Sequence, residues 1–325
     1  MKLKKSRLSI MGLAALLILF YHIYPIGNQQ GTFNNILKFI IRNAFIGVDI
    51  FFFCSAYMYR FSRKDSYIAY AKNKLAKLFP LFVISSLLYF FLGNMDIKKT
   101  IMTIFGVDLF VSGGGSFLWF LPSLIIVYLL VLPLYERLVK KVGESAGLII
   151  GLVISLGGLY LLEKAPGSHA VNIFLTRIPI VLLGYSFSAH EGSFKGTRKL
   201  VAGLGIFLLG LAINYYYIYV IKKDLLFTGS FYCISIPLVI GCIMVIDYIR
   251  SKLSLRGLEF FGTISLELYC LQMLVGFLIF EKLIGLTGNK ILAFAIDFIL
   301  IVFVAYLVKL ARDGIKKIYK RSAKA

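Results

Sequence analysis

Charged residues are scarce in this chain: 16% of its 325 residues carry a charge, and only 15 are acidic. Histidine occurs three times and tryptophan once. The hydrophobic share is 59%, above the roughly 45–50% found in soluble domains. The charges lie in clusters between long apolar runs, and no polar stretch is long enough to enclose a core of its own. This scarcity excludes a soluble globular protein and predicts an all-α, polytopic membrane protein.

Cysteine is equally rare, and its placement excludes two further classes of protein. The four cysteines lie in apolar segments without the spacing of a disulfide framework or a metal site. Glycine-rich loops that bind phosphates or dinucleotides are also missing. We therefore expect neither a bound metal nor a bound cofactor. The cysteines are interpreted as small core residues: Cys54, Cys233, Cys242 and Cys270.

Ten apolar segments long enough to cross a membrane follow one another along the chain. Lysine and arginine give an independent check, because cytoplasmic loops carry an excess of both. Most of the 36 basic residues fall in alternate connections if both termini are cytoplasmic. The sequence therefore predicts about ten transmembrane helices in the plasma membrane, with both termini inside. The ranges are 8–26, 40–60, 76–93, 117–135, 146–163, 171–189, 199–220, 228–248, 262–285 and 291–310, with a short interfacial or re-entrant piece at 100–112.

The ends of the chain carry much of its positive charge. A basic start followed by an apolar run resembles a signal peptide, but no small-residue cleavage site follows it, so we expect a retained first helix. Residues 1–325 are predicted to form one transmembrane domain with a basic cytoplasmic tail from about 311. The net charge of +21 is interpreted as a topology signal and as contact with anionic membrane lipids, not with nucleic acid.

His22 lies in an apolar run near the end of the first predicted helix. One interpretation is an interfacial histidine in an aromatic belt. The other is a general base, since histidine titrates near neutral pH and can take a proton from a hydroxyl group. The remaining histidines, His169 and His190, fall in or near loops and are expected to be solvated.

Asp49 lies inside the second predicted helix, where a carboxylate is costly and usually faces a polar interior. It is interpreted either as the group that orients a histidine base or as half of a structural ion pair with Arg42 or Arg60. Lys74 and Lys77 share one face if the third helix already runs there. They are either ordinary cytoplasmic anchors or a site for phosphate groups.

Two more residues in predicted helices are large side chains with polar groups and are candidate site residues. Trp119, the only tryptophan, follows a run of glycines and is either an interfacial belt residue or part of a site. Arg177 lies within the membrane and needs a partner there, unless its side chain reaches the interface. None of these residues identifies a function when taken alone.

Taken in order, these motifs resemble the transmembrane acyltransferase-3 family over almost the whole chain. Members of that family O-acetylate cell-surface polysaccharides, lipopolysaccharide, peptidoglycan and some small molecules. The family pattern is a histidine late in helix one, a Gly-Val-Asp motif in helix two, a basic pair before a proline, Trp-Phe-Leu, an arginine with a later glycine, and Gly-x-Ile-Ser-x-x-x-Tyr. The matching residues are His22; Gly47, Val48, Asp49, Phe51, Phe52 and Ser55; Lys74, Lys77 and Pro80; Trp119, Phe120 and Leu121; Arg177 and Gly184; and Gly262, Ile264, Ser265 and Tyr269.

The resemblance implies a membrane O-acyltransferase that uses acyl-CoA, usually acetyl-CoA, as donor and a hydroxyl of a glycan or glycolipid as acceptor. It implies catalytic roles for His22 and Asp49. The residues implied in donor binding are Lys74, Lys77 and Arg177, and those implied in substrate binding are Ser55, Trp119 and Tyr269.

The chain departs from the family pattern in four ways. The basic pair is normally arginine but is Lys74 and Lys77 here, and Ala56 stands where the family has a glycine after the helix-two serine. Met11 stands where the family has an arginine eleven residues before its histidine, and Arg7 lies one helical turn further out. Gln272 stands where the family has a histidine three residues after its tyrosine. They leave open a second interpretation, a non-catalytic relative that acts as a transporter, a flippase-like carrier or a scaffold in surface polysaccharide synthesis.

Overall fold

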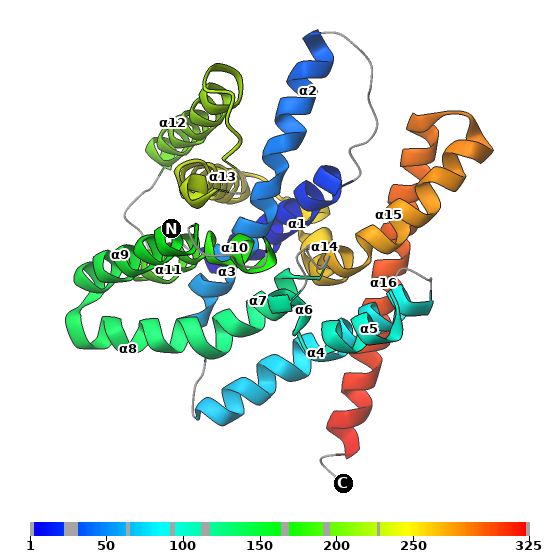
Figure 1. Cartoon of the computed structure of the whole chain (residues 1–325), viewed down its shortest axis with the longest axis horizontal. Helices are drawn as coiled ribbons and strands as arrows, with labels where there is room; N and C mark the ends of the chain where they lie inside the picture. Colours follow the sequence, from blue (N-terminus) through cyan, green and yellow to red (C-terminus); the bar gives the residue numbers. More distant parts are fainter. Residues whose placement is uncertain are drawn as a thin grey trace.

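The computed structural model describes residues 3–22, 32–62, 66–91, 95–111, 118–163, 169–190, 196–225 and 228–322. Within these ranges every regular element is a helix, which confirms the all-α class. Figure 1 shows the helices crossing one another at varied angles, with α1 near the centre and α16 along one side. The fold follows from composition: apolar segments in a membrane satisfy their backbone polar groups internally by forming helices.

The helices before residue 143 include two short ones at the predicted 100–112 piece and one π-helical turn, η2. Those after it include a second π-helical turn, η4. In chain order they are α1 (Leu3–His22), α2 (Thr32–Arg42), η1 (Asn43–Phe45), α3 (Ile46–Tyr59), α4 (Tyr67–Phe91), α5 (Ile97–Ile104), α6 (Asp108–Val111), α7 (Phe120–Ile126), η2 (Val127–Val131), α8 (Leu132–Val142), α9 (Glu144–Glu163), α10 (His169–Leu175), α11 (Ile178–Phe187), η3 (Ser188–His190), α12 (Gly196–Tyr215), η4 (Tyr216–Val220), η5 (Gly229–Phe231), α13 (Tyr232–Lys252), α14 (Arg256–Thr263), α15 (Ser265–Thr287) and α16 (Lys290–Ser322).

Six helices of the described residues are long and apolar enough to cross a membrane. Helices overlap all ten predicted ranges, but length and composition support a crossing for only six of them, so the number ten stays a prediction. The shorter apolar helix Val171–Phe187 lies in a seventh predicted range. The six candidate spans are Tyr67–Phe91, Phe120–Val142, Glu144–Leu161, Gly196–Val220, Tyr232–Lys252 and Lys290–Gly314.

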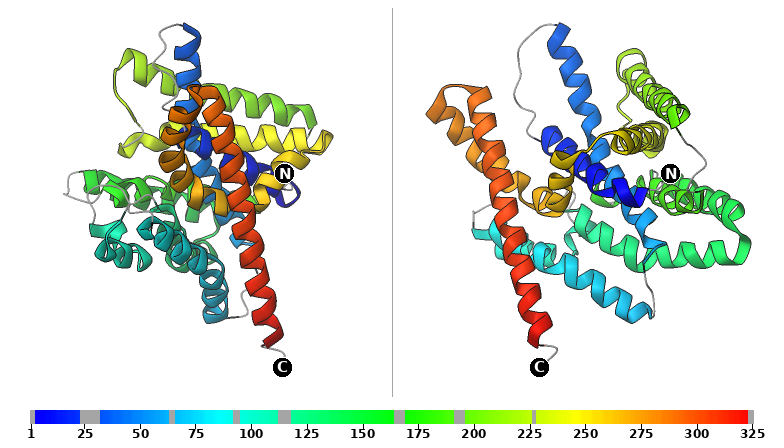
Figure 2. Two further views of the ribbon diagram at one scale, coloured as in Figure 1. Left: turned by 90° about the vertical axis from the view of Figure 1, so that its right-hand side faces the viewer. Right: turned by 180° about the vertical axis from the view of Figure 1, so that it is seen from behind.

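Two helices extend further than their apolar residues predicted. α4 begins at Tyr67, nine residues before the predicted start, so Lys74 and Lys77 lie on a helix and share a face. α16 continues to Ser322 through most of the basic tail. At 1.5 Å per residue its 33 residues span about 50 Å, more than the roughly 30 Å hydrocarbon core. Figure 2 shows its C-terminal end projecting beyond the other helices.

The central helix α1 packs against α3, α14 and α15. It approaches α3 closely at Gly47, where a Cβ atom would lie 2.4 Å from the backbone oxygen of Ala14 and 2.6 Å from Ile18. A buried cluster also joins α1 to α12 and α13, because Asp247 pairs with Lys199 and accepts a hydrogen bond from Ser6. These contacts fix the position of α1 within the bundle.

The Gly-x-Ile-Ser motif forms a break between two helices. α14 ends at Thr263, Ile264 leaves helical geometry, and α15 begins at Ser265, whose hydroxyl donates to the Gly262 carbonyl. Gly262 lies directly on α1: a Cβ atom there would be 2.0 Å from the backbone oxygen of Leu8. The motif therefore allows α14 to touch α1 and sets the point from which α15 begins.

Replacing Gly262 with alanine is expected to destabilise the fold by about 1–3 kcal/mol, because the new methyl group meets backbone that has to shift. Gly257 of the same helix has no atom within 4 Å of the corresponding position, so Gly257→Ala provides a matched control. Thermal unfolding of the detergent-solubilised protein measures both variants. Equal melting temperatures for the two variants would show that this close approach does not limit stability.

Candidate functional site

Asp49 and Arg177 form the only described ion pair in which neither side chain is more than 5% exposed. Arg177 Nε lies 3.3 Å from Asp49 Oδ1. Its Nη1 donates hydrogen bonds to the Ile173 carbonyl at 3.0 Å and to Thr176 Oγ1 at 2.6 Å. Charges buried in this way need partners of opposite charge, and each member of this pair partly neutralises the other. Arg42 and Arg60, the two partners expected for Asp49, pair instead with Asp224 and Glu144.

The pair is assembled by a broken helix and a close helix crossing. α10 ends at Leu175 and α11 begins at Ile178, so Arg177 lies in the gap between them. Pro179 occupies the first turn of α11, where its missing N–H group costs no hydrogen bond. Gly184 then lets α11 contact α3, because a Cβ atom there would be 2.5 Å from the backbone oxygen of Phe53. The arginine-and-glycine motif thus places Arg177 beside Asp49.

Aromatic rings surround the Arg177 guanidinium and connect it to α15. Its central carbon lies 4.1 Å from the ring centre of Phe231 and 5.6 Å from that of Trp119, both within range of a cation–π interaction. Phe120, the neighbour of Trp119, stacks edge-on against buried Tyr269 at 4.9 Å. The structure therefore brings four predicted site residues, Asp49, Trp119, Arg177 and Tyr269, into one connected group.

Both Asp49 carboxylate oxygens and Arg177 Nε lack a hydrogen bond in the structure, although the two side chains face each other. The Gln272 amide, three residues after Tyr269, is 1% exposed and also makes none. Each buried polar group without a hydrogen bond costs about 1–3 kcal/mol. We call Asp49, Arg177, Trp119, Tyr269 and Gln272 the central cluster.

His22 ends α1 and is half-buried beside Tyr21, with their ring centres 5.2 Å apart. Asp49 accepts no hydrogen bond from it, so the structure does not show the expected pairing of base and orienting carboxylate. Tyr21 provides a link instead, because it lies within electrostatic reach of Arg177 and of the Arg42–Asp224 pair. The connection between His22 and the central cluster therefore runs through Tyr21.

Lys74 belongs to a separate group at the other end of the bundle. Its ammonium lies 3.9 Å from the ring centre of Tyr128 and 5.3 Å from that of Tyr70. The Tyr128 side chain is within hydrogen-bonding reach of Ser55 on α3. Lys77, one turn along α4, is exposed. We call Arg7, Ser55, Lys74, Lys77 and Tyr128 the basic cluster.

Sequence reasoning missed Tyr128, which lies in the π-helical turn η2. Such turns are rare and occur frequently at functional sites. The turn leaves the Leu129 carbonyl to accept a hydrogen bond of 2.5 Å from Tyr67 on α4. No residue type within 117–135 predicts this turn. The only signal in the sequence was a tyrosine within an apolar segment.

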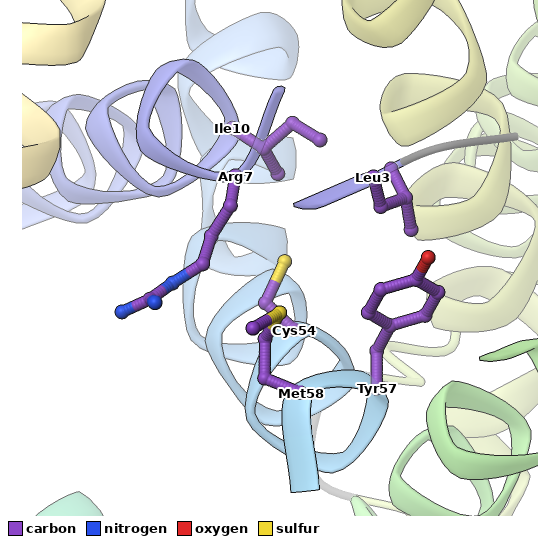
Figure 3. Close-up of a pocket in the computed structure, with 6 residues that line it drawn as sticks. All are labelled: Leu3, Arg7, Ile10, Cys54, Tyr57 and Met58. Carbon is purple, nitrogen blue, oxygen red and sulfur yellow. The ribbon is translucent and has the colours of Figure 1, made fainter. Parts of the chain in front are cut away.

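Arg7 brings a third cation to the basic cluster. It lies within electrostatic reach of Tyr128 and Cys54, and its Nε is 3.4 Å from Met11 Sδ. Figure 3 shows the small hollow beside it, where Cys54 and Tyr57 of α3 face the first turns of α1. The guanidinium thus reaches along the helix to the side chain of Met11, the position that departs from the family pattern.

Arg177 does not join the basic cluster; its described contacts are with Asp49, its own helix break and the neighbouring rings. The glycines and serine before Trp119, Gly113 to Ser116, lie outside the described residues. Two groups of polar side chains therefore lie in the helical bundle, and α1 passes both, with Arg7 at one end and His22 at the other.

Polar clusters among long apolar helices are typical of a membrane protein. A family model described as an acyltransferase domain matches residues 11–310 of the chain. The chain therefore belongs to the acyltransferase-3 family. No curated protein and no solved structure matches it. Family membership supports an acyltransferase activity in a membrane protein.

Proposed function

We propose that this protein is a membrane O-acyltransferase that moves an acetyl group from acetyl-CoA to a hydroxyl of a cell-surface polysaccharide or glycolipid. The donor approaches from the cytoplasmic face at the basic cluster, and the acceptor approaches from the opposite face near His22. Membrane lipids surround the bundle. The observation that carries this proposal, together with the family match, is that α1 connects the two clusters.

The basic cluster suits the donor because coenzyme A carries several phosphate groups. Lys74 and Lys77 offer point charges, and Arg7 offers a planar guanidinium that can bind a phosphate with two hydrogen bonds. Arg7 reaches Met11, so it supplies a cation where the family has its arginine. His22 lies fifteen positions after Arg7, which places them about 22 Å apart along α1.

The central cluster suits the reacting groups because it contains buried polar atoms without hydrogen bonds. A substrate carbonyl or hydroxyl placed between Arg177 and Gln272 would supply those missing partners. Arg177 would also stabilise negative charge that develops on the carbonyl oxygen. Asp49 holds the guanidinium in place, Ser55 lies on the path from the donor, and the rings of Trp119 and Tyr269 line the acyl group.

The chemistry is a single exchange of bonds. The His22 imidazole accepts the proton of the acceptor hydroxyl while the hydroxyl oxygen forms a bond to the thioester carbonyl carbon. The carbon–sulfur bond then breaks, and the departing sulfur takes up a proton. The products are an acetyl ester of the glycan and coenzyme A with a free thiol.

Calorimetric titration with acetyl-CoA tests the donor site. The detergent-purified protein is expected to bind acetyl-CoA, and the Lys74→Ala, Lys77→Ala double variant to lose that binding, because two of the three cations are removed. Lys140 and Lys141 provide the control pair, since both are exposed at the end of α8. Their alanine double variant should bind as the wild type does. No binding by folded wild-type protein would favour the non-catalytic interpretation.

A further inference from the structure

Three aromatic rings touch one another where α2 lies beside the end of α12 and the turn η4. Tyr215 and Tyr219 have ring centres 4.6 Å apart. Phe39 of α2 lies 5.7 Å from Tyr215 and 6.2 Å from Tyr219. The tyrosines remain 54% and 47% exposed despite these contacts. We call these three residues the aromatic platform.

The backbone beneath the platform has two unusual features. η4 turns Tyr216–Val220 into a π-helix, and Lys222 has a φ of 56°, the left-handed region that lysine rarely adopts. Such local departures are costly and occur preferentially at functional sites. They direct the chain from the end of α12 back toward α2, where Asp224 pairs with Arg42 at 2.5 Å. An aromatic residue that only anchors a helix in lipid needs neither feature.

The platform is continuous with the site proposed for catalysis. Arg42 and Asp224, which are 38% and 42% exposed, lie beside it. The same two charges lie within electrostatic reach of Tyr21, the neighbour of His22. Asn214, one residue before the platform, donates to Asn43 on η1 at 2.8 Å and fixes α12 to the start of α3. The exposed rings, the Arg42–Asp224 pair and Tyr21, the neighbour of the proposed base His22, therefore lie near one another.

We propose that the aromatic platform binds a sugar ring of the acceptor glycan and presents a neighbouring hydroxyl to His22. One face of a pyranose carries several C–H groups that stack on an aromatic ring, while its hydroxyls bond to charged side chains at the edge. The Arg42–Asp224 pair supplies both a donor and an acceptor for those hydroxyls. Acyl chains of lipid would use the rings but leave the ion pair without a role. This assignment rests on the proposed function.

The experiment measures base-labile acetyl ester on the surface glycan of the native host, normalised to the amount of this protein in the membrane. Tyr215→Ala, Tyr219→Ala should lower the ester about tenfold, which corresponds to the loss of one modest binding interaction. Tyr215→Phe, Tyr219→Phe should stay within about twofold of wild type, because both rings remain. The affinity of the purified variants for acetyl-CoA should not change.

Tyr216→Ala is the matched control, because Tyr216 is 51% exposed on the same helix end and contacts Tyr217 rather than Phe39. Its ester level should match that of the wild type. Wild-type ester in the alanine double variant, or an equal loss in Tyr216→Ala, would overturn the platform while leaving the enzyme intact. If wild-type cells carry no ester that depends on this protein, the proposed function is wrong. The assignment of the aromatic platform as a sugar-binding site is then wrong as well.

Discussion

Acyl transfer by the His22→Ala variant is expected to fall by about 10²–10⁴-fold, while acetyl-CoA binding stays intact. A general base in the right position contributes a factor of this size. Its removal leaves the acceptor hydroxyl without a group to take its proton. His22 is half-buried at the end of α1, and the basic cluster lies at the other end, so the substitution leaves the donor site untouched.

The measurement is single-turnover transfer from radiolabelled acetyl-CoA to an extracted surface glycan, followed as ester that mild base releases. His190→Ala is the histidine control, because His190 ends the short helix η3 after α11 and the reaction gives it no role. It should transfer at the wild-type rate. A His22→Ala variant that binds donor and transfers at the wild-type rate would show that another group accepts the proton.

The helical class and the approximate positions of the helices could be predicted because both follow from local composition. Apolar runs between clusters of charge are enough to locate helices in a membrane. The exact ends of α4 and α16 could not be predicted, because these helices continue through charged residues that also favour helix formation. The breaks at Ile264 and Arg177 could not be predicted either, because they depend on contacts with α1 and α3 that are distant in the sequence.

The sequence identified most residues of the candidate site but did not identify which of them contact one another. Asp49 and Arg177 were both identified as costly charges, yet Asp49 was assigned to arginines at helix ends. Arg177 was the one basic residue that fell in no predicted connection or terminus, so the need to neutralise buried charges could have paired the two. Tyr128 and Phe231 could not be found in this way, because an aromatic residue in an apolar segment has no local signal for its tertiary contacts.

Breaking the Asp49–Arg177 pair from either side is expected to destabilise the protein by about 3–5 kcal/mol, because the remaining charge is buried without its partner. Arg177→Met and Asp49→Leu each leave such a charge. The double variant removes both charges and should recover much of the lost stability, since apolar pairs often replace buried ion pairs without cost. Thermal unfolding in detergent measures the recovery. We expect acyl transfer to remain lost, because Arg177 no longer faces the carbonyl.

Lys199 and Asp247 provide the matched control for that experiment. They form a second ion pair that is 6% and 10% exposed and lies between α12 and α13, where the reaction assigns no role. Lys199→Met, Asp247→Leu should recover both stability and acyl transfer relative to its single variants. Recovery of stability without activity at Asp49 and Arg177, but of both properties at Lys199 and Asp247, would separate a charge used in catalysis from one that holds helices together. Equal recovery of activity in both double variants would show that Asp49 and Arg177 are structural, and the source of transition-state stabilisation would then have to be sought at His22 and the basic cluster.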